Sequence, residues 1–473
     1  MTQLSTPLHA PEGAGGRVGG AATGRPPNSA AIALLGAFRP IGAAGNNRLR
    51  PWLDPVPGSA QLCFAPMRFK AGSKNGLADG PNPRTNTIIN KVGGFLDLSQ
   101  LYGSTVDSAA ALRNADGSMK STHGGQALQI VEHRFVAGDQ RVNENPELVA
   151  VTTLFMREHN FWVRTLAAQN PGWSGEQLYQ MARAITTAEY QNIIYEEFLP
   201  LLAGPAVRHW RRYDARVNAQ VAQEFSTAAF RVGHSQVSET QSGIDNDGKL
   251  VFTQSLADAF FNSAEQTLQN GIDALLRNVT AEFSQATDAY TVPVMRNLLF
   301  APLPGGNIDQ VDLIAIDIQR QRDVGIATLA RTRRALGLPR LRSFADLCAD
   351  RALRRAFQDI YCSIDQVDLF MGGLAEAPAD GAVVGPTFQA IIARQFRNLR
   401  DGDRFYWRNQ GFDRATAALI ASTKLSRILR RNTDSTSVPD DMFVAAARMP
   451  ARARHDPRRA IDTHGFERPA EMR

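Results

Sequence analysis

The pattern of apolar and polar positions along the chain predicts a protein built mainly from α-helices. Apolar residues recur with helical spacing in 147–168, in a segment that begins at Ser174, and in 251–278, 311–335 and 384–400. The start at Ser174 is the clearest, because Ser174 and Gln177 form a capping box, and Pro200 and Gly204 are expected to end that segment. Runs with strand-like spacing are few and short. We therefore expect a mainly α, single large domain whose chemistry lies between helices.

Composition places the 473-residue chain among globular proteins with a large core, since 43% of its residues are hydrophobic and 21% are charged. No apolar run is long enough to span a bilayer, which argues against a membrane span. The N-terminus lacks a basic start followed by an apolar stretch, so a cleaved signal peptide is not expected. The localisation therefore stays open between the cytoplasm and export without a cleaved signal.

The two ends differ in composition from the rest of the chain. Residues 1–37 are rich in Gly, Ala and Pro, and residues 449–473 are basic and poor in apolar side chains, so we expect a disordered head and a flexible tail around a domain at 38–448. The net charge is +6, but the arginines are dispersed, which disfavours a nucleic-acid-binding stripe. Three cysteines are too few for a disulfide framework or a thiolate metal site, a mild argument for a reducing compartment.

Two further motifs are interpreted as structural. REHN (157–160) places Glu158 beside His159 on different helical faces, whereas a zinc pair needs i, i+4 spacing and a third ligand. We therefore interpret REHN as a core motif. The glycines of GGLAE (372–376) and DGDR (401–404) lack the spacing of a phosphate-binding loop and are expected to mark turns.

His234 lies at the centre of AFRVGHSQV, and alone it would be a satisfied core histidine. Four companion stretches change that interpretation: GDQRVNENPEL (138–148), AIDIQRQRDVG (315–325), VDLFMGGLAE (367–376) and VGPTFQAIIARQFRNLRDGDRFYW (384–407). In this order the five stretches resemble the animal-type haem peroxidase family, part of the peroxidase–cyclooxygenase superfamily. The resemblance covers the chain from about Phe38 to Val444 and implies haem b as the cofactor.

The resemblance assigns the proximal side of the haem. His234 matches the ligand of the iron, and Asp317 occupies the position of its hydrogen-bonding partner, where the family usually has an Asn. Arg231 and Arg320 match two arginines that face the haem propionates. A carboxylate accepts the imidazole N–H more strongly than an amide does, so Asp317 is expected to favour oxidised iron and lower the reduction potential.

The resemblance also assigns part of the distal side. Arg141 matches the arginine that stabilises the departing oxygen of the peroxide, and Glu144 matches an acid that forms an ester with a haem methyl in some relatives. The family further uses a distal His as acid–base, ahead of a calcium motif matched here by GGFLDLSQLYGS (93–104). Residues 85–93 lead straight into that motif. We therefore expect that the distal segment is deleted near 85–93.

The histidines that remain offer no clear replacement. His9 lies in the low-complexity head, and no other His precedes His123; His123 and His133 both follow the calcium motif. In that motif Asp97, Ser99 and the carbonyl of Phe95 are oxygen donors. The family usually has a Thr at the position of Gly93 and a further Asp beside the distal His, and this chain lacks both. We therefore expect weak or no calcium binding, with Asp97 as a cap or turn residue.

The leading hypothesis from the sequence is a haem peroxidase that uses hydrogen peroxide to oxidise a small donor, impaired by the missing segment. The alternatives are a non-catalytic haem-binding relative, a fatty-acid oxygenase and a helical interaction scaffold without haem. The oxygenase is disfavoured because Arg231 and Val232 stand where those relatives carry a tyrosine motif. The hypothesis of a scaffold without haem predicts that His234→Ala leaves all measurable properties unchanged.

Overall fold

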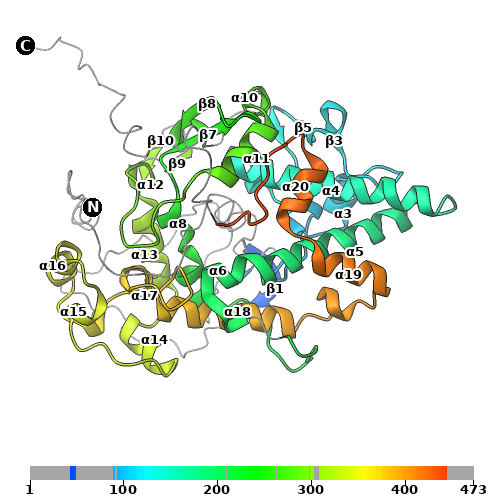
Figure 1. Cartoon of the computed structure of the whole chain (residues 1–473). Helices are drawn as coiled ribbons and strands as arrows, with labels where there is room; N and C mark the ends of the chain where they lie inside the picture. Colours follow the sequence, from blue (N-terminus) through cyan, green and yellow to red (C-terminus); the bar gives the residue numbers. More distant parts are fainter. Residues whose placement is uncertain are drawn as a thin grey trace, which may run out of the picture.

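The computed structural model describes residues 43–48, 89–90, 93–207, 210–260, 264–297, 299–302 and 308–444. The expected head at 1–37, the tail at 449–473 and most of the junction at 85–93 lie outside these residues. Helices dominate the described part, and the molecule forms a single mainly α domain, as predicted (Figure 1). No helix in these ranges has both the length and the apolar character needed to cross a membrane.

The helices follow one another along most of the chain, with short 3₁₀ turns such as η3 (Gln140–Glu144) and η6 (Ala229–Arg231) between them. The α-helices are α2 (Ser99–Tyr102), α3 (Val106–Ala111), α4 (Pro146–Gln169), α5 (Gly175–Ile193), α6 (Leu199–Ala203), α7 (Gln223–Thr227), α8 (Gly233–Gln236), α9 (Leu256–Ala259), α10 (Ala264–Asn270), α11 (Ile272–Ala281), α12 (Val294–Asn297), α13 (Leu313–Asp323), α14 (Leu329–Ala335), α15 (Phe344–Leu347), α16 (Arg351–Ile360), α17 (Leu369–Ala375), α18 (Pro386–Asp401), α19 (Arg414–Ser422) and α20 (Leu425–Asn432).

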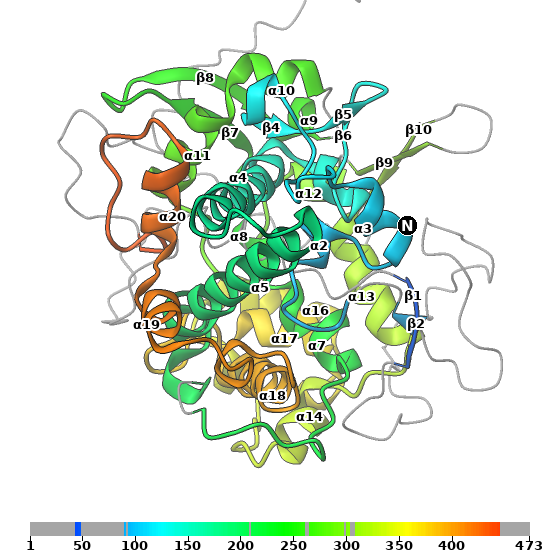
Figure 2. The same cartoon turned by 90° about the vertical axis from the view of Figure 1, so that its right-hand side faces the viewer.

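The strands of the described chain pair only as short antiparallel two-stranded sheets, in the order β1–β2, β3–β4, β5–β6, β7–β8 and β9–β10. They are β1 (Ala43–Arg48), β2 (Ile89–Asn90), β3 (Ser121–Thr122), β4 (Ala127–Leu128), β5 (Ile130–Val131), β6 (Arg134–Phe135), β7 (Thr240–Ile244), β8 (Leu250–Ser255), β9 (Leu299–Pro302) and β10 (Ile308–Val311). The labelled hairpins lie around the helical body (Figure 2).

The long helices α4 and α5 pack against each other and form the centre of the domain (Figures 1 and 2). Asn145 caps α4 by accepting a hydrogen bond from the Leu148 amide, and Pro146 occupies the first turn, where no amide hydrogen is needed. The capping box at Ser174 and Gln177 forms as predicted and starts α5. Phe155 and Tyr190 meet edge to face between the two helices, with ring centroids 5.3 Å apart.

The prediction that Pro200 ends the α5 segment was wrong. The helix widens into a π turn at Ile194–Phe198 and continues as α6, which contains Pro200. Pro200 has no amide hydrogen to donate, and the wider turn lies directly before it. Gly204 does end the segment, and its φ of 65° explains why a glycine stands there.

Two predicted helices are interrupted. The segment 251–278 begins in strand β8, because Val251, Phe252 and Thr253 are β-branched or aromatic residues that pair with β7. Helices α9, α10 and α11 follow. The segment 311–335 is divided into α13 and α14 around Gly325, which has a φ of 72°.

The glycines of GGLAE do not mark a turn, contrary to the prediction. Gly372 and Gly373 lie inside α17, and a Cβ on Gly373 would come within 2.1 Å of the Phe388 ring on α18. The missing side chains therefore let these helices pack closely. Gly402 of DGDR follows the last residue of α18 and is a turn residue, as expected.

REHN is a buried structural motif on α4. Arg157 donates to the carbonyls of Gln126 and Asn432 and to Asp273, and Asn160 exchanges hydrogen bonds with the backbone of Met119. Glu158 pairs with Arg431 and accepts a hydrogen bond from Asn432, both on α20. The motif thus joins α4 to the last helix of the domain.

Candidate functional site

His234 is held by the carboxylate of Asp317. The histidine lies on α8, its side chain is 23% exposed, and its Nδ1 hydrogen-bonds Oδ2 of Asp317 on α13. Nε2 makes no hydrogen bond to any residue that the structure describes. Because an ionised carboxylate can only accept a hydrogen bond, Nδ1 carries the hydrogen and donates it, and the lone pair of Nε2 is available to a metal ion.

Asp317 is completely buried and serves two partners. Its Oδ1 accepts a hydrogen bond of 2.9 Å from Nη1 of Arg231, while Oδ2 faces His234. Burial alone would raise the pKa of Asp317, but His234 and Arg231 outweigh that effect and hold the pKa below its usual value. Asp317 is therefore a carboxylate at neutral pH, as its role as acceptor requires.

Two arginines give this cluster an excess of positive charge. Arg231, on η6, is fixed by a 3.1 Å hydrogen bond from its Nε to the carbonyl of Ser226. Arg320 lies one turn beyond Asp317 on α13 and makes no hydrogen bond to any side chain or carbonyl in the described ranges. Burial, followed by the charge of Arg231, lowers the pKa of Arg320 to about 10. A partly buried cation in this state is a favourable place for an anion.

This donor set fits haem. One imidazole nitrogen is available for the iron, its other nitrogen is fixed by a carboxylate, and Arg231 and Arg320 bring two positive charges against the single negative charge of Asp317. A haem group offers the complementary features, namely a metal ion and two propionates. The structure thus brings together the four residues predicted for the proximal side.

Arg141 occupies a different environment. It lies on η3, and its Nε donates to both carboxylate oxygens of Asp139, at 2.9 and 3.0 Å, while Nη2 also contacts that carboxylate. Asp139 also caps η3 by accepting from the Arg141 amide at 3.0 Å. Glu144 is the last residue of the same turn and is partly buried. Asp139 was not among the predicted site residues, although an Asp that precedes a short helical turn is a typical capping residue.

The residues of the calcium motif lie together. The amide of Ser99 donates to Oδ1 of Asp97 at 2.9 Å, so Asp97 acts as a turn residue before α2. A Cβ on Gly93 would lie 2.5 Å from Oγ of Ser99 and 2.9 Å from Oδ2 of Asp97. Within the described residues, no three His, Cys, Asp or Glu side chains form a group that could hold a metal ion.

The two histidines that follow the motif lie in turns. His123 begins a 3₁₀ turn between β3 and β4, and His133 lies between β5 and β6, with a side chain that is 83% exposed and paired with Glu265. Both adopt positive φ values.

The chain matches known proteins along most of its length. The sequence profile described as animal haem peroxidase matches residues 50–443. This chain belongs to the animal haem peroxidase family. Human eosinophil peroxidase is 35% identical over 399 residues, which cover 76% of this chain and 55% of that protein. Peroxinectin A of Dictyostelium discoideum is 32% identical over 366 residues, covering 73% and 67%. This haem peroxidase family member spans about half the length of the human relative.

Solved structures place the chain in the same fold. Peroxidase A from Dictyostelium discoideum superposes with a TM-score of 0.72 at 26% identity, covering 89% of this chain and 87% of that one. Fatty acid alpha-dioxygenase from Arabidopsis thaliana gives a TM-score of 0.70 at 18% identity, covering 90% and 76%. At that identity the second likeness concerns the fold alone. The family implies a haem cofactor, in agreement with the donor set around His234.

Proposed function

We propose that this protein is a haem-dependent peroxidase that reduces hydrogen peroxide and oxidises a small organic donor. The observation that carries the proposal is the contact of His234 Nδ1 with the buried carboxylate of Asp317, which leaves Nε2 available for iron. An imidazole fixed in this way is a stronger ligand than a free one. Family membership supports the reaction class.

Haem, when bound, would supply the iron that activates the peroxide and the capacity to take electrons from a donor. His234 would hold the iron through Nε2, and Asp317 would keep the ring oriented with its proton on Nδ1. Arg231 and Arg320 would bind the propionates by charge-assisted hydrogen bonds. These four residues would hold the haem from the side of α8 and α13.

Arg141 is proposed to stabilise the negative charge that develops on the departing oxygen of the peroxide. Its ion pair with Asp139 holds the guanidinium in place through Nε and Nη2. Glu144, on the same turn, would be a hydrogen-bonding acid or a covalent attachment point for the haem. Residual calcium binding at Asp97 and Ser99 is not required for either role.

A second candidate function is haem binding without efficient turnover. Two observations favour it: Asp139 neutralises Arg141, and the sequence has no His between His9 and His123 to serve as the distal acid–base. Loss of such a group costs about 10²- to 10⁴-fold in rate. Haem uptake with a peroxide reaction slower by that factor would favour this second function.

The test is a haemin titration of the purified chain, followed in the Soret region and ended by a single addition of peroxide. We expect saturable binding that is lost in His234→Ala and retained in the matched control His133→Ala, whose side chain is exposed. A spectral change on peroxide addition that reverses with an added donor supports the peroxidase. A Soret band that only bleaches supports the binding function, and no saturable band contradicts both.

A further inference from the structure

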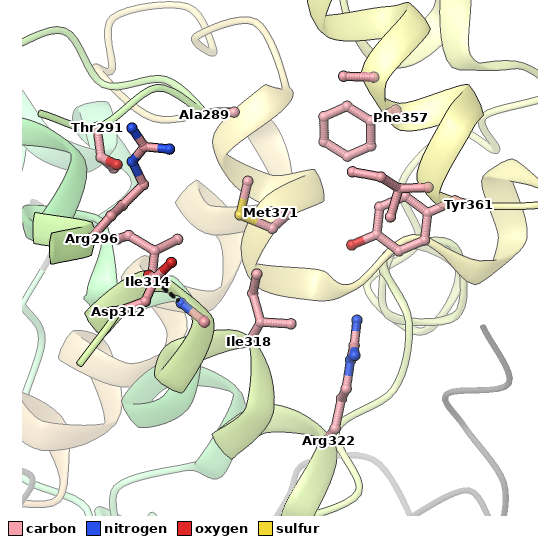
Figure 3. Close-up of a pocket in the computed structure, with 13 residues that line it drawn as sticks. Ala289, Thr291, Arg296, Asp312, Ile314, Ile318, Arg322, Phe357, Tyr361 and Met371 are labelled. Atoms are coloured by element: carbon pink, nitrogen blue, oxygen red, sulfur yellow. Dashed lines mark hydrogen bonds between the residues drawn. The ribbon is translucent and has the colours of Figure 1, made fainter. Parts of the chain in front are cut away.

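A pocket lies on the far side of α13 from His234. It has about 700 Å³ of space, its open mouth included, and is lined by residues of α13, α16 and α17 and of the loop before α12 (Figure 3). Ile318 and Arg322, one turn apart on α13, face this pocket. Arg320 points to the opposite side of the same helix and Asp317 is rotated by about 100° from Ile318; neither lines the pocket. The pocket is therefore separate from the donor set around His234.

The wall of this pocket is apolar and suits a flat ring. Phe357 of α16 and Tyr361, which follows the last residue of that helix, stack with ring centroids 5.6 Å apart and an interplanar angle of 22°. Ile318 and Met371 line the pocket from α13 and α17, as Figure 3 shows. Ligand pockets are lined mainly by apolar and aromatic side chains with a few polar groups, as this one is.

One end of the pocket is polar but electrically balanced. Arg322 donates to Asp368 from Nε at 3.1 Å and from Nη2 at 2.5 Å, and the Tyr361 hydroxyl donates to the same carboxylate at 2.9 Å. Burial and the charge of Asp368 raise the pKa of Tyr361 far above its usual value, so the hydroxyl stays neutral. The charges of Arg322 and Asp368 cancel at this end.

This polar end can still bind a ligand oxygen. The Tyr361 proton is directed to Asp368, which leaves the lone pairs of its hydroxyl as acceptors. Arg322 has five N–H groups and gives two of them to Asp368. A hydroxyl on the ligand could donate to Tyr361 and accept from Arg322. A carboxylate could only accept, and it would add a net charge to an end that is already neutral.

The opposite end also carries one residue of each charge. Asp312 and Arg296 both line it, and Asp312 caps α13 by accepting from the Ala315 amide at 2.9 Å. We propose that the pocket binds a small neutral aromatic molecule with one hydroxyl group, a phenol, as a ligand site separate from the haem site. This site does not depend on the proposed peroxidase function.

The test measures binding of phenol, toluene and benzoate to the purified full chain by ligand-observed NMR and calorimetry. We expect phenol to bind at least threefold more tightly than either comparator. Equal binding of toluene would refute the role of the polar end, and tighter binding of benzoate would refute the preference for a neutral ligand. Binding of phenol should be unchanged in His234→Ala; its loss there would place the ligand at the haem site and overturn the proposal.

Substitutions on α16 locate the ligand. Ala356 lines the pocket, whereas Ala352 on the same helix is exposed. Ala356→Phe should weaken phenol binding at least tenfold, and the matched control Ala352→Phe should leave it unchanged. Unchanged binding in a folded Ala356→Phe protein overturns the proposal.

A second variant covers the case in which Ala356→Phe does not fold. Tyr361→Phe removes the hydroxyl and keeps the ring, so it should weaken phenol binding several-fold without affecting toluene. Equal effects on both molecules would contradict the proposed contact.

Discussion

Asp317 is fully buried, and its Oδ2 hydrogen-bonds Nδ1 of His234 from a different helix. The carboxylate is kept ionised by the histidine and by Arg231, which together lower its pKa despite burial. A single residue of α13 thus fixes the tautomer of His234 and holds Arg231 beside it. A substitution that removes the charge of Asp317 should therefore change the properties of His234 as a ligand.

Asp317→Asn should raise the reduction potential of the bound haem. An amide accepts the Nδ1 hydrogen less strongly than a carboxylate, so the imidazole donates less electron density to the iron. The expected rise is on the order of 50 mV, which corresponds to about a tenfold change in the relative stability of the two oxidation states. Potentiometric titration measures it. Asp312→Asn, at the cap of the same helix, is the control, and an equal or lower potential in Asp317→Asn contradicts the prediction.

Arg141→Gln should slow the reaction with peroxide about 100-fold, since one donor aimed at a developing negative charge contributes roughly this factor. Haem affinity should change little, because Arg141 lies on η3 and not in the cluster around His234. Stopped-flow absorbance after mixing with peroxide gives the rate. Arg134→Gln, an exposed arginine of β6, serves as control. An undiminished rate in Arg141→Gln would remove the proposed distal role.

Arg431→Met should destabilise the fold by about 3 kcal/mol, because breaking a buried ion pair leaves an uncompensated carboxylate. Arg431 contacts the fully buried Glu158, lies 3.7 Å from Glu189, and stacks over Phe161. Urea denaturation measures the free energy of unfolding. Arg430→Met is the matched control, since Arg430 is exposed, pairs with the exposed Asp440 and donates to the Val438 carbonyl, and its loss should cost less than about 1 kcal/mol. Similar effects of both substitutions would contradict the prediction.

His159 should make stability fall as the pH drops from 6.5 towards 4. Burial lowers its pKa to about 4, and the neutral ring accepts from the Tyr102 hydroxyl at 3.0 Å and donates to the Gly117 carbonyl at 3.0 Å. The unfolded chain takes up the proton first, so up to about 3 kcal/mol of stability, present above pH 6.5, is lost by pH 4. Denaturant titrations between pH 4 and 7 test this.

The matched substitutions are His159→Gln and His133→Gln. A glutamine at position 159 cannot be protonated, so this part of the pH dependence should disappear, whereas the exposed His133 should leave it intact. An unaltered pH profile in His159→Gln would mean that the histidine is not the group responsible.

Glu147 should have the opposite effect at higher pH. Burial, and then the neighbouring Glu282, raise the pKa of Glu147 to about 8. Because the folded pKa exceeds the unfolded value, the stabilising contribution is complete below about pH 4.5 and is lost as the pH rises through 8. Glu147→Gln should reduce the fall in the free energy of unfolding between pH 5 and 8.5, and the part that remains is expected from Glu282, whose pKa burial raises to about 7. A fall as steep as in the unsubstituted protein would contradict the prediction for Glu147.

Long periodic segments with clear caps were predictable from the sequence. Asn145, Pro146 and Ser174 fix where α4 and α5 start, because capping depends on residues next to each other in the chain. The break at Gly325 and the strand at Val251 were missed, since apolar residues continue through both and only the local backbone preference distinguishes them.

The features of the site also differ in how far the sequence predicts them. The pairing of His234 with Asp317 was predictable only through resemblance, since 83 residues separate them. The ion pair of Arg141 with Asp139 was not predicted, although only two residues separate them. The spacing alone does not show whether the guanidinium contacts its own turn or faces a cavity. The pocket behind α13 had no signal in the sequence, since its walls come from helices that are each typical core elements.

The contacts between α4 and α20 also limit the order in which parts of the domain can fold during translation. Arg157 donates to the carbonyl of Asn432, 275 residues later, and Glu158 pairs with Arg431 at nearly the same separation. While translation is still upstream of residue 431, the carboxylate of Glu158 lacks its partner and α4 cannot settle into its final packing. The last helix of the domain must therefore be synthesised before α4 reaches its final packing, although α4 itself lies in the first half of the sequence.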